Sequence, residues 1–190
     1  MENIESTYDF EKLRQITLAP WIAKATPLLK KKRKIGGNMF RHQMATMTIL
    51  IDYGYIHSVL LKASVIHDLI EDIPCTNIYE LLKIDDEAQD VVNLVLEVTQ
   101  RKGEEKPEFL ERILTYGSKG AKIIKCADRI SNLIDLQQVL LKDESIIKTL
   151  DDTEKYVLKM AEQVNMHMFT EIFDLINKKR NQIRGLNDDE

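Results

Sequence analysis

The chain has 190 residues, a length typical of one domain. Hydrophobic residues make up 44% and charged residues 31%, the balance of a soluble globular protein. Seven glycines and four prolines are too few for a long disordered linker or for an all-β chain dense in turns. The net charge of −4 argues against bulk electrostatic binding to nucleic acid, although a local basic patch stays open.

The cysteines and the N-terminal residues indicate the cellular compartment of the protein. The two cysteines, Cys75 and Cys126, form no C-x-x-C pair, which is typical of reduced thiols in a cytoplasmic protein. The first twelve residues, MENIESTYDFEK, are acidic and lack the apolar stretch of a signal peptide. No apolar run approaches the roughly 20 residues that cross a bilayer. We therefore expect a cytoplasmic protein with no membrane partner.

The first half of the chain shows helical periodicity interrupted by proline and glycine. Pro20 suits the first turn of a helix, and Pro27 would kink or divide that helix. Gly36 and Gly37 predict a loop, and Gly54 predicts a helix end. The helices predicted here cover about residues 10–17, the segment from Pro20 to the basic run 30–34, and residues 40–53 and 58–72.

The second half is equally helical. Asn77 and Glu80 have the spacing of a capping box for a short helix. Pro107 suits a helix start and Gly117 a helix end. The longer helices predicted here cover about residues 86–99, 107–117, 119–141, 151–164 and 168–182.

No segment alternates persuasively with the period of a β-strand. The sequence therefore predicts one all-α domain of about nine or ten helices. We expect residues 1–19 to form an N-terminal helical extension, residues 20–184 to form the domain, and residues 185–190 to be a frayed tail.

Four side chains could meet at one metal ion if three helices converge. Imidazole and carboxylate are a normal mixed ligand set for a divalent metal, and the candidates are His42, His67, Asp68 and Asp128. A His-Asp dipeptide alone is also consistent with an ordinary hydrogen-bonded pair, so its surroundings must decide.

The residues around the His-Asp pair favour a bound cation. The preceding segment 63–66 is mostly apolar, which predicts burial, and buried charge is costly unless it is paired or metal-bound. On a continuous helix, Glu71 would share a face with His67 and Asp68, and Asp72 would follow one turn after Asp68. A cation would offset the repulsion between these carboxylates. A solvated acidic helix end is the alternative, but it opposes the helix dipole.

Two further features have a structural and a functional interpretation. Asp128, Asn132 and Asp135 form one polar stripe on an otherwise apolar helix, either a site wall or a solvated face. The basic run 30–34 is either a pocket mouth that attracts an anion or a solvated helix end.

The ordered motifs resemble the HD superfamily of metal-dependent phosphohydrolases, over about residues 20–180. More narrowly, the chain resembles the hydrolase domain of RelA/SpoT-type alarmone enzymes and their small stand-alone relatives. Those carry an R-x-x-G loop, a His about six residues later, H-D-x-x-E-D, E-V-T and A-D-[KR]-x-x-N. The matching segments are Arg33 to Gly36, His42, 67–72, 97–99 and 127–132.

This resemblance implies a metal centre with a catalytic pair beside it. One ion, typically manganese in this family, would be held by His42, His67, Asp68 and Asp128. Glu71 and Asp72 would handle the water and its protons.

The resemblance also implies a substrate. Arg33 and Lys34 would line the nucleotide pocket, and Asn132 would contact sugar or phosphate. The substrate would be a guanosine tetra- or pentaphosphate alarmone that loses pyrophosphate from its 3′ position. We expect hydrolysis without synthesis, no nucleic-acid partner, and regulation by a partner or by self-association as a homo-oligomer.

Several positions depart from the family pattern. They are Asn38 and Met39 in place of Pro-Tyr, Gln43 in place of Pro, Leu69 in place of Thr, and Ile134 in place of Arg. We expect none of them to touch the metal centre, so base and phosphate recognition would differ more than the reaction type.

Two other functions are consistent with the sequence. One is an HD phosphohydrolase that acts on a different nucleotide or on a cyclic dinucleotide. The other is a non-enzymatic alarmone-binding module. The intact ligand set together with Glu71 and Asp72 argues against the second, because a protein that only binds needs no water-activating pair.

Overall fold

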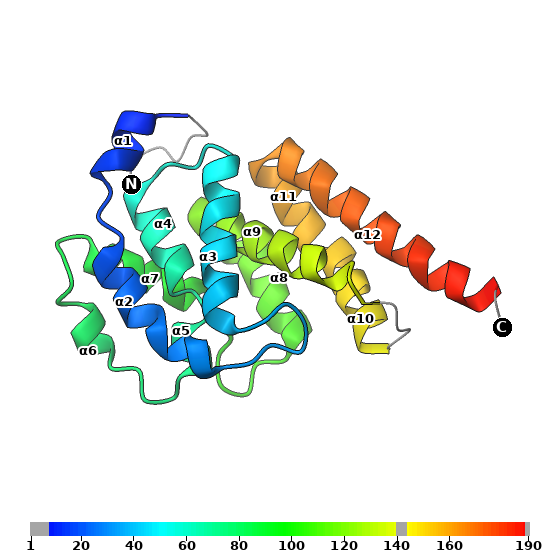
Figure 1. Ribbon diagram of the computed structural model, residues 1–190, viewed down its shortest axis with the longest axis horizontal. Helices are drawn as coiled ribbons and strands as arrows, with labels where there is room; N and C mark the ends of the chain where they lie inside the picture. The colour runs from blue at the N-terminus through cyan, green and yellow to red at the C-terminus, as the bar shows by residue number, and fades with distance from the viewer. Residues whose placement is uncertain (1–7, 140–143, 189–190) are drawn as a thin grey trace.

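Helices follow one another along the whole described chain (Figure 1). The computed structural model describes residues 8–139 and 144–188, where the only pairing of strand type is an isolated antiparallel bridge between Lys32 and Asn38. The all-α prediction is confirmed. The elements up to the middle of the chain are α1 (Phe10–Gln15), α2 (Ala19–Ala25), a 3₁₀ helix (Thr26–Lys30), α3 (Met39–Asp52), α4 (Ser58–Val65), α5 (Leu69–Asp72) and α6 (Ile78–Leu81).

The second half holds the longer helices. They are α7 (Ala88–Val98), α8 (Lys106–Tyr116), α9 (Lys119–Leu136), α10 (Glu144–Asp152), a π-helical segment (Thr153–Val157), α11 (Leu158–Val164) and α12 (Met166–Asp188). None of the helices in the described ranges combines the length and the apolar character needed to span a membrane.

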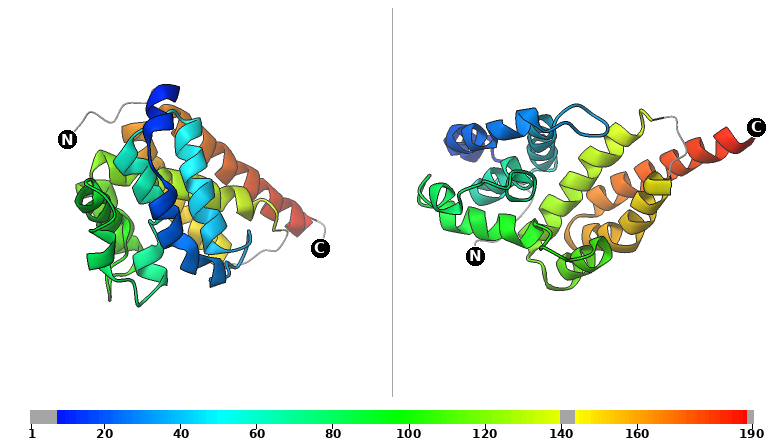
Figure 2. Two further views of the ribbon diagram at one scale, coloured as in Figure 1. Left: turned by 60° about the vertical axis from the view of Figure 1, so that its left-hand side comes forward. Right: turned by 90° about the horizontal axis from the view of Figure 1, so that it is seen from below.

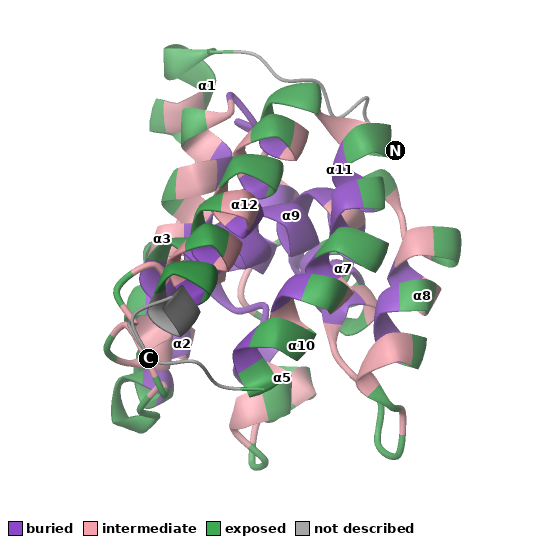
Figure 3. Ribbon diagram, turned by 90° about the vertical axis from the view of Figure 1, so that its right-hand side faces the viewer, coloured by how far each residue is buried: buried purple, intermediate pink, exposed green. Residues whose placement is uncertain are grey.

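Helix α9 lies between the N-terminal and the C-terminal helices (Figure 2). It packs against α3 and α7 on one side and against α11 and α12 on the other. Every residue from Ile123 to Ser131 is buried, as the colouring of Figure 3 shows for the middle of this helix. Any polar side chain in this stretch is therefore enclosed by protein and needs a partner there.

Side-chain caps define the ends of α3 and α9. The Asn38 side chain accepts a hydrogen bond from the backbone N–H of Arg41 at 2.8 Å, and Gly54 follows α3 with a φ of 72°. The Ser118 side chain accepts from the N–H of Ala121 at 3.1 Å at the start of α9. These caps confirm the predicted boundaries near residues 40–53 and 119.

The continuous helix predicted over residues 58–72 is wrong. Helix α4 ends at Val65, and α5 begins only at Leu69. Ile66, with φ −127° and ψ 15°, leaves helical geometry. The His67-Asp68 pair therefore sits in a turn between two helices rather than on the face of one.

The C-terminal region also differs from its prediction. Helix α9 ends at Leu136 rather than near 141, and residues 140–143 lie outside the described residues. Helix α12 continues to Asp188 where a frayed tail was predicted, while residues 1–7 and 189–190 lie outside the description. Ile183 is 7% exposed, so packing continues into the last turns of α12.

A buried lysine joins α4 to the segment before α7. Lys62 is 5% exposed, and its Nζ lies 2.9 Å from Asp85 Oδ2 and 2.5 Å from Glu87 Oε2. The indole N–H of Trp21 donates to the same Asp85 oxygen at 2.8 Å. Because this ammonium has two carboxylate partners, its burial is compensated.

We predict that Lys62→Met lowers the free energy of unfolding by about 2 kcal/mol, because both carboxylates lose a charged donor. Urea denaturation measures this change. Lys24→Met is the matched control, since the ion pair of Lys24 with Glu80 is exposed and should contribute little. Equal losses in the two variants would contradict this interpretation of the Lys62 cluster.

Candidate metal centre and nucleotide pocket

Three of the four predicted metal ligands meet inside the protein. His42 comes from α3, His67 from the turn after α4, and Asp128 from α9. Each offers one ligand atom, and these three atoms lie within 4.8 Å of one another. All three residues are buried.

The hydrogen bonds of His67 leave one ring nitrogen available for a metal. Its Nδ1–H donates to the carbonyl oxygen of Ser64 at 2.7 Å, so the lone pair of the neutral ring lies on Nε2. Nε2 is buried, and it lies 3.1 Å from the Asp68 carboxylate. A proton on Nε2 would face this carboxylate, and a metal ion could take the place of that proton.

The other two ligand candidates surround the same space. His42 Nδ1 lies 3.0 Å from the Ser131 hydroxyl, and His42 Nε2 lies 3.1 Å from Asp128 Oδ1. Asp68 Oδ2 lies 3.1 Å from His67 Nε2 and 3.6 Å from His42 Nε2. Two imidazoles and two carboxylates therefore face one another, a donor set that fits a divalent transition metal.

Mutual charge stabilises this cluster in the absence of an ion. Burial alone would lower the pKa of His67, but the carboxylates of Asp68 and Asp128 raise it to about 9. Burial alone would raise the pKa of Asp128, yet the Lys125 ammonium and the His42 imidazole bring it well below its ordinary range. Burial alone would also raise the pKa of Asp68, but the His67 imidazole lowers it to about 2, so both carboxylates are ionised and would attract a cation.

The turn between α4 and α5 redirects the His-Asp pair. In a continuous helix the N–H of Asp68 would donate to the carbonyl of Ser64. Here that carbonyl accepts from His67, and the N–H of Asp68 donates to Gln43 Oε1 at 3.4 Å. The predicted helix face shared by His67, Asp68 and Glu71 is therefore wrong, although the turn still brings His67 and Asp68 together.

A departure from the family pattern touches this centre, contrary to expectation. The Gln43 side chain donates from Nε2 to Asp68 Oδ2 at 2.9 Å. In the sequence, Gln43 stands where the family has a proline, and this difference alone does not indicate which group the amide contacts.

A cavity of about 460 Å³ is lined by three of the four ligand candidates, His42, Asp68 and Asp128. The predicted substrate residues Arg33, Lys34 and Asn132 line it, as does Glu71. Asp72 lies outside this lining and pairs with Lys31, whose Nζ is 3.1 Å from Asp72 Oδ1. Further lining residues come from α8, α9 and α10, among them Lys106, Phe109, Lys125, Arg129, Asp135, Ser145 and Thr149.

Hydrogen bonds connect the pocket loop to the metal centre. The Arg33 guanidinium donates to Asp135 and, at 2.5 Å, to Asn132 Oδ1. The Asn132 amide in turn donates to Asp128 Oδ1 at 2.5 Å. The predicted polar stripe on α9 is therefore a wall of the cavity, and it links Arg33 to a candidate metal ligand.

The sequence analysis missed three cations in the cavity wall. Lys125 Nζ donates to Asp128 Oδ2 at 2.6 Å. The neighbouring Lys125, followed by burial, lowers the pKa of Lys106 to about 8. Arg129 is buried, and its Nε has no hydrogen-bond partner among the described residues. The sequence held two signals for this cluster: the three-residue spacing of Lys125 and Asp128, and Arg129 at the basic position of the A-D-[KR]-x-x-N motif. Together the three cations make the cavity suited to an anion.

Comparisons with known proteins find similarity among solved structures. No protein-family model and no curated protein matches the chain. A solved structure of a metazoan ortholog of SpoT, described as hydrolysing ppGpp and playing a role in starvation responses, superposes with a TM-score of 0.74. The two are 24% identical, and the match covers 91% of this chain and 98% of that one. The chain shares the fold of this hydrolase over nearly its whole length.

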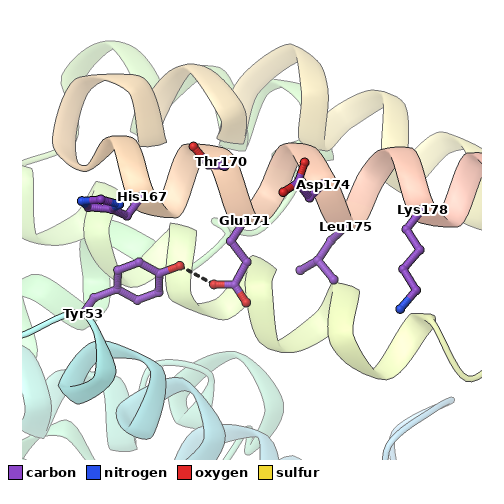
Figure 4. Close-up of a pocket in the computed structure, with 7 residues that line it drawn as sticks. All are labelled: Tyr53, His167, Thr170, Glu171, Asp174, Leu175 and Lys178. Carbon is purple, nitrogen blue, oxygen red and sulfur yellow. Dashed lines mark hydrogen bonds between the residues drawn. The ribbon is translucent and has the colours of Figure 1, made fainter.

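A second cavity, of about 470 Å³, lies between the end of α3 and α12 (Figure 4). The Tyr53 hydroxyl donates to Glu171 there. Burial and the Glu171 carboxylate raise the pKa of this hydroxyl. Tyr53 follows His42 by eleven residues, about 16 Å along a helix, so this cavity is separate from the candidate metal centre.

The pocket loop approaches α9 at a glycine. Gly36 has a φ of +82°, and a Cβ there would lie 2.2 Å from Asp135 Oδ2. We predict that Gly36→Ala lowers the free energy of unfolding by at least about 1 kcal/mol more than Gly103→Ala. Gly103 is the matched control because its φ of +81° is equally strained, but nothing lies within 4 Å of its Cβ position. Urea denaturation of both variants measures the difference, and equal losses would show that Asp135 does not approach the loop.

Proposed function

We propose that this chain is a metal-dependent phosphohydrolase that removes pyrophosphate from the 3′ position of guanosine 3′,5′-bis(diphosphate)-type alarmones. One observation carries the proposal: a buried His-His-Asp cluster lies at a cavity that is lined by two of its members, His42 and Asp128, and by several cations. The motif resemblance and the shared fold with a ppGpp hydrolase support it.

The proposed metal centre consists of His42, His67, Asp68 and Asp128, with Mn²⁺ as the expected ion. Such an ion would lower the pKa of water and neutralise charge on the attacked phosphate. The protein positions the donors: Ser64 fixes the ring of His67, and Lys125 and Asn132 hold the Asp128 carboxylate. These partners keep the ligands in place before an ion arrives.

Glu71 is the proposed general base. It lies in α5, three residues after Asp68, and lines the cavity. Its Oε2 accepts from the backbone N–H of Gln100 at 3.1 Å, which orients the carboxylate and leaves Oε1 to take a proton from water. Asp72, paired with Lys31, is proposed to support this role from the edge of the site.

The cationic wall would hold the phosphates. Lys106 and Arg129 make no ion pair among the described residues, so their charge is available to an anionic substrate. Arg33 and Lys34 would line the nucleotide end, and Asn132 would contact sugar or phosphate. We propose residues 20–184 as the hydrolase domain.

The proposed setting is the cytoplasm, as part of a stringent response. Two cysteines without a disulfide, Cys75 and Cys126, are consistent with it. The proposed ligand is a small guanine nucleotide, not a nucleic acid or a membrane, and a homo-oligomer stays open.

A phosphate-release screen tests the function. The purified protein is given Mn²⁺ with each of a panel of nucleotides, including guanosine tetra- and pentaphosphate. Pyrophosphate with GDP or GTP should appear, and only with the alarmones. Release from another nucleotide alone would move the protein to a different phosphohydrolase activity. Tight alarmone binding without turnover would make it a binding module.

Removing a ligand should remove the ion. We predict that His67→Ala and Asp128→Ala each lose the bound Mn²⁺ that the unmodified protein carries, and with it the metal-dependent rise in melting temperature. Elemental analysis and thermal denaturation with and without metal measure this. His167→Ala is the control, since this exposed histidine lies away from the site. Full occupancy in both ligand variants would exclude the proposed centre.

Removing the base should separate turnover from binding. We predict that Glu71→Gln keeps the metal and the fold but lowers kcat by about 10²–10⁴-fold, because the amide cannot accept a proton. Steady-state kinetics at saturating Mn²⁺ and alarmone measure kcat. A wild-type rate would transfer the role of base to Asp72.

A further inference from the structure

We propose that Gln43 is a positioning residue of the metal centre, which holds Asp68 in place and stabilises the break between α4 and α5. The inference rests on the proposed metal centre. Gln43 follows His42 on α3, so one helix supplies both a candidate ligand and the side chain that positions another.

Gln43 contacts Asp68 with both ends of its amide. Nε2 donates to Asp68 Oδ2 at 2.9 Å, and Oε1 accepts from the backbone N–H of Asp68 at 3.4 Å. The Gln43 side chain is completely buried. A buried amide that satisfies both a donor and an acceptor of one residue fixes that residue in position and orientation.

The contacted oxygen is the one that faces the imidazoles. Asp68 Oδ2 lies 3.1 Å from His67 Nε2 and 3.6 Å from His42 Nε2. The Gln43 donor is uncharged, so it can direct this oxygen without competing as a cation. This is the arrangement in which a partner outside the ligand set orients a ligand carboxylate.

Asp68 needs such a partner more than the other ligand candidates do. Its side chain is 22% exposed, whereas those of His42 and Asp128 are 2% and 7% exposed. Packing therefore restrains Asp68 least, and without Gln43 its carboxylate could rotate toward solvent.

Gln43 also replaces a lost helical hydrogen bond. The Ser64 carbonyl is taken by His67 Nδ1, which leaves the N–H of Asp68 without its helical acceptor. Gln43 Oε1 supplies the acceptor instead. The break that turns His67 and Asp68 toward each other is thus stabilised from α3.

Two variants of Gln43 test the proposal, with Mn²⁺ itself as the probe. Gln43→Met keeps the volume and removes both polar ends. Gln43→Asn keeps the amide but draws it back by one C–C bond, about 1.5 Å, out of reach of Asp68. Gln137→Met is the matched control, because the Gln137 amide donates to the carbonyls of Leu133 and Leu175, away from the centre.

The measurement is the Mn²⁺ dissociation constant by titration calorimetry, with the melting temperature of the metal-free protein recorded alongside. We expect both Gln43 variants to weaken Mn²⁺ binding by about 10–100-fold. Gln137→Met should bind as the unmodified protein does, even if its melting temperature falls.

Unchanged affinity in a folded Gln43 variant, while the unmodified protein binds Mn²⁺, would overturn the positioning role and leave the proposed function standing. An equal weakening in Gln137→Met would also overturn it, since the effect would then come from general destabilisation. An unmodified protein that binds no Mn²⁺ would overturn the metal centre and the inference together.

Discussion

A carboxylate buried in the middle of α9 is the constraint on which the rest of the site depends. Asp128 is 7% exposed on the side chain and enclosed by protein, where an unpaired charge would be prohibitively costly. Its oxygens are instead shared among Lys125, Asn132 and the His42 imidazole. Helices α3 and α4 pack against α9. This packing buries apolar side chains, and it also brings partners to the buried charge of Asp128.

The same network couples the metal centre to the nucleotide pocket. Arg33 donates to Asn132, and Asn132 donates to Asp128, so hydrogen bonds join this candidate metal ligand to the loop that carries Arg33 and Lys34. Gly36 allows Asp135 to approach this loop closely and to hold Arg33 from the other side. The proposed substrate-binding residues and the candidate metal ligands therefore belong to one hydrogen-bond network, and α9 supplies its central members.

Local sequence signals predicted the fold well where they act within one helix. Asn38, Ser118 and Gly54 mark helix ends because their effect is confined to a few neighbouring residues. The ordered motifs also indicated His42, His67 and Asp128, which the structure brings together. The break after Val65 escaped prediction because the acceptor of the Asp68 N–H there is Gln43, a residue 25 positions earlier on another helix. Lys106 and Arg129 were missed for the same reason, since only tertiary packing places them on one cavity wall.

The central claim is that three separate segments of the chain hold one ion. A crystal structure of the protein grown with Mn²⁺, with anomalous difference density collected at the manganese edge, tests it most directly. We expect one strong peak within coordination distance of His42 Nε2, His67 Nε2, Asp68 Oδ2 and Asp128 Oδ1. No peak at this position, or a peak that contacts only exposed carboxylates elsewhere, would contradict it.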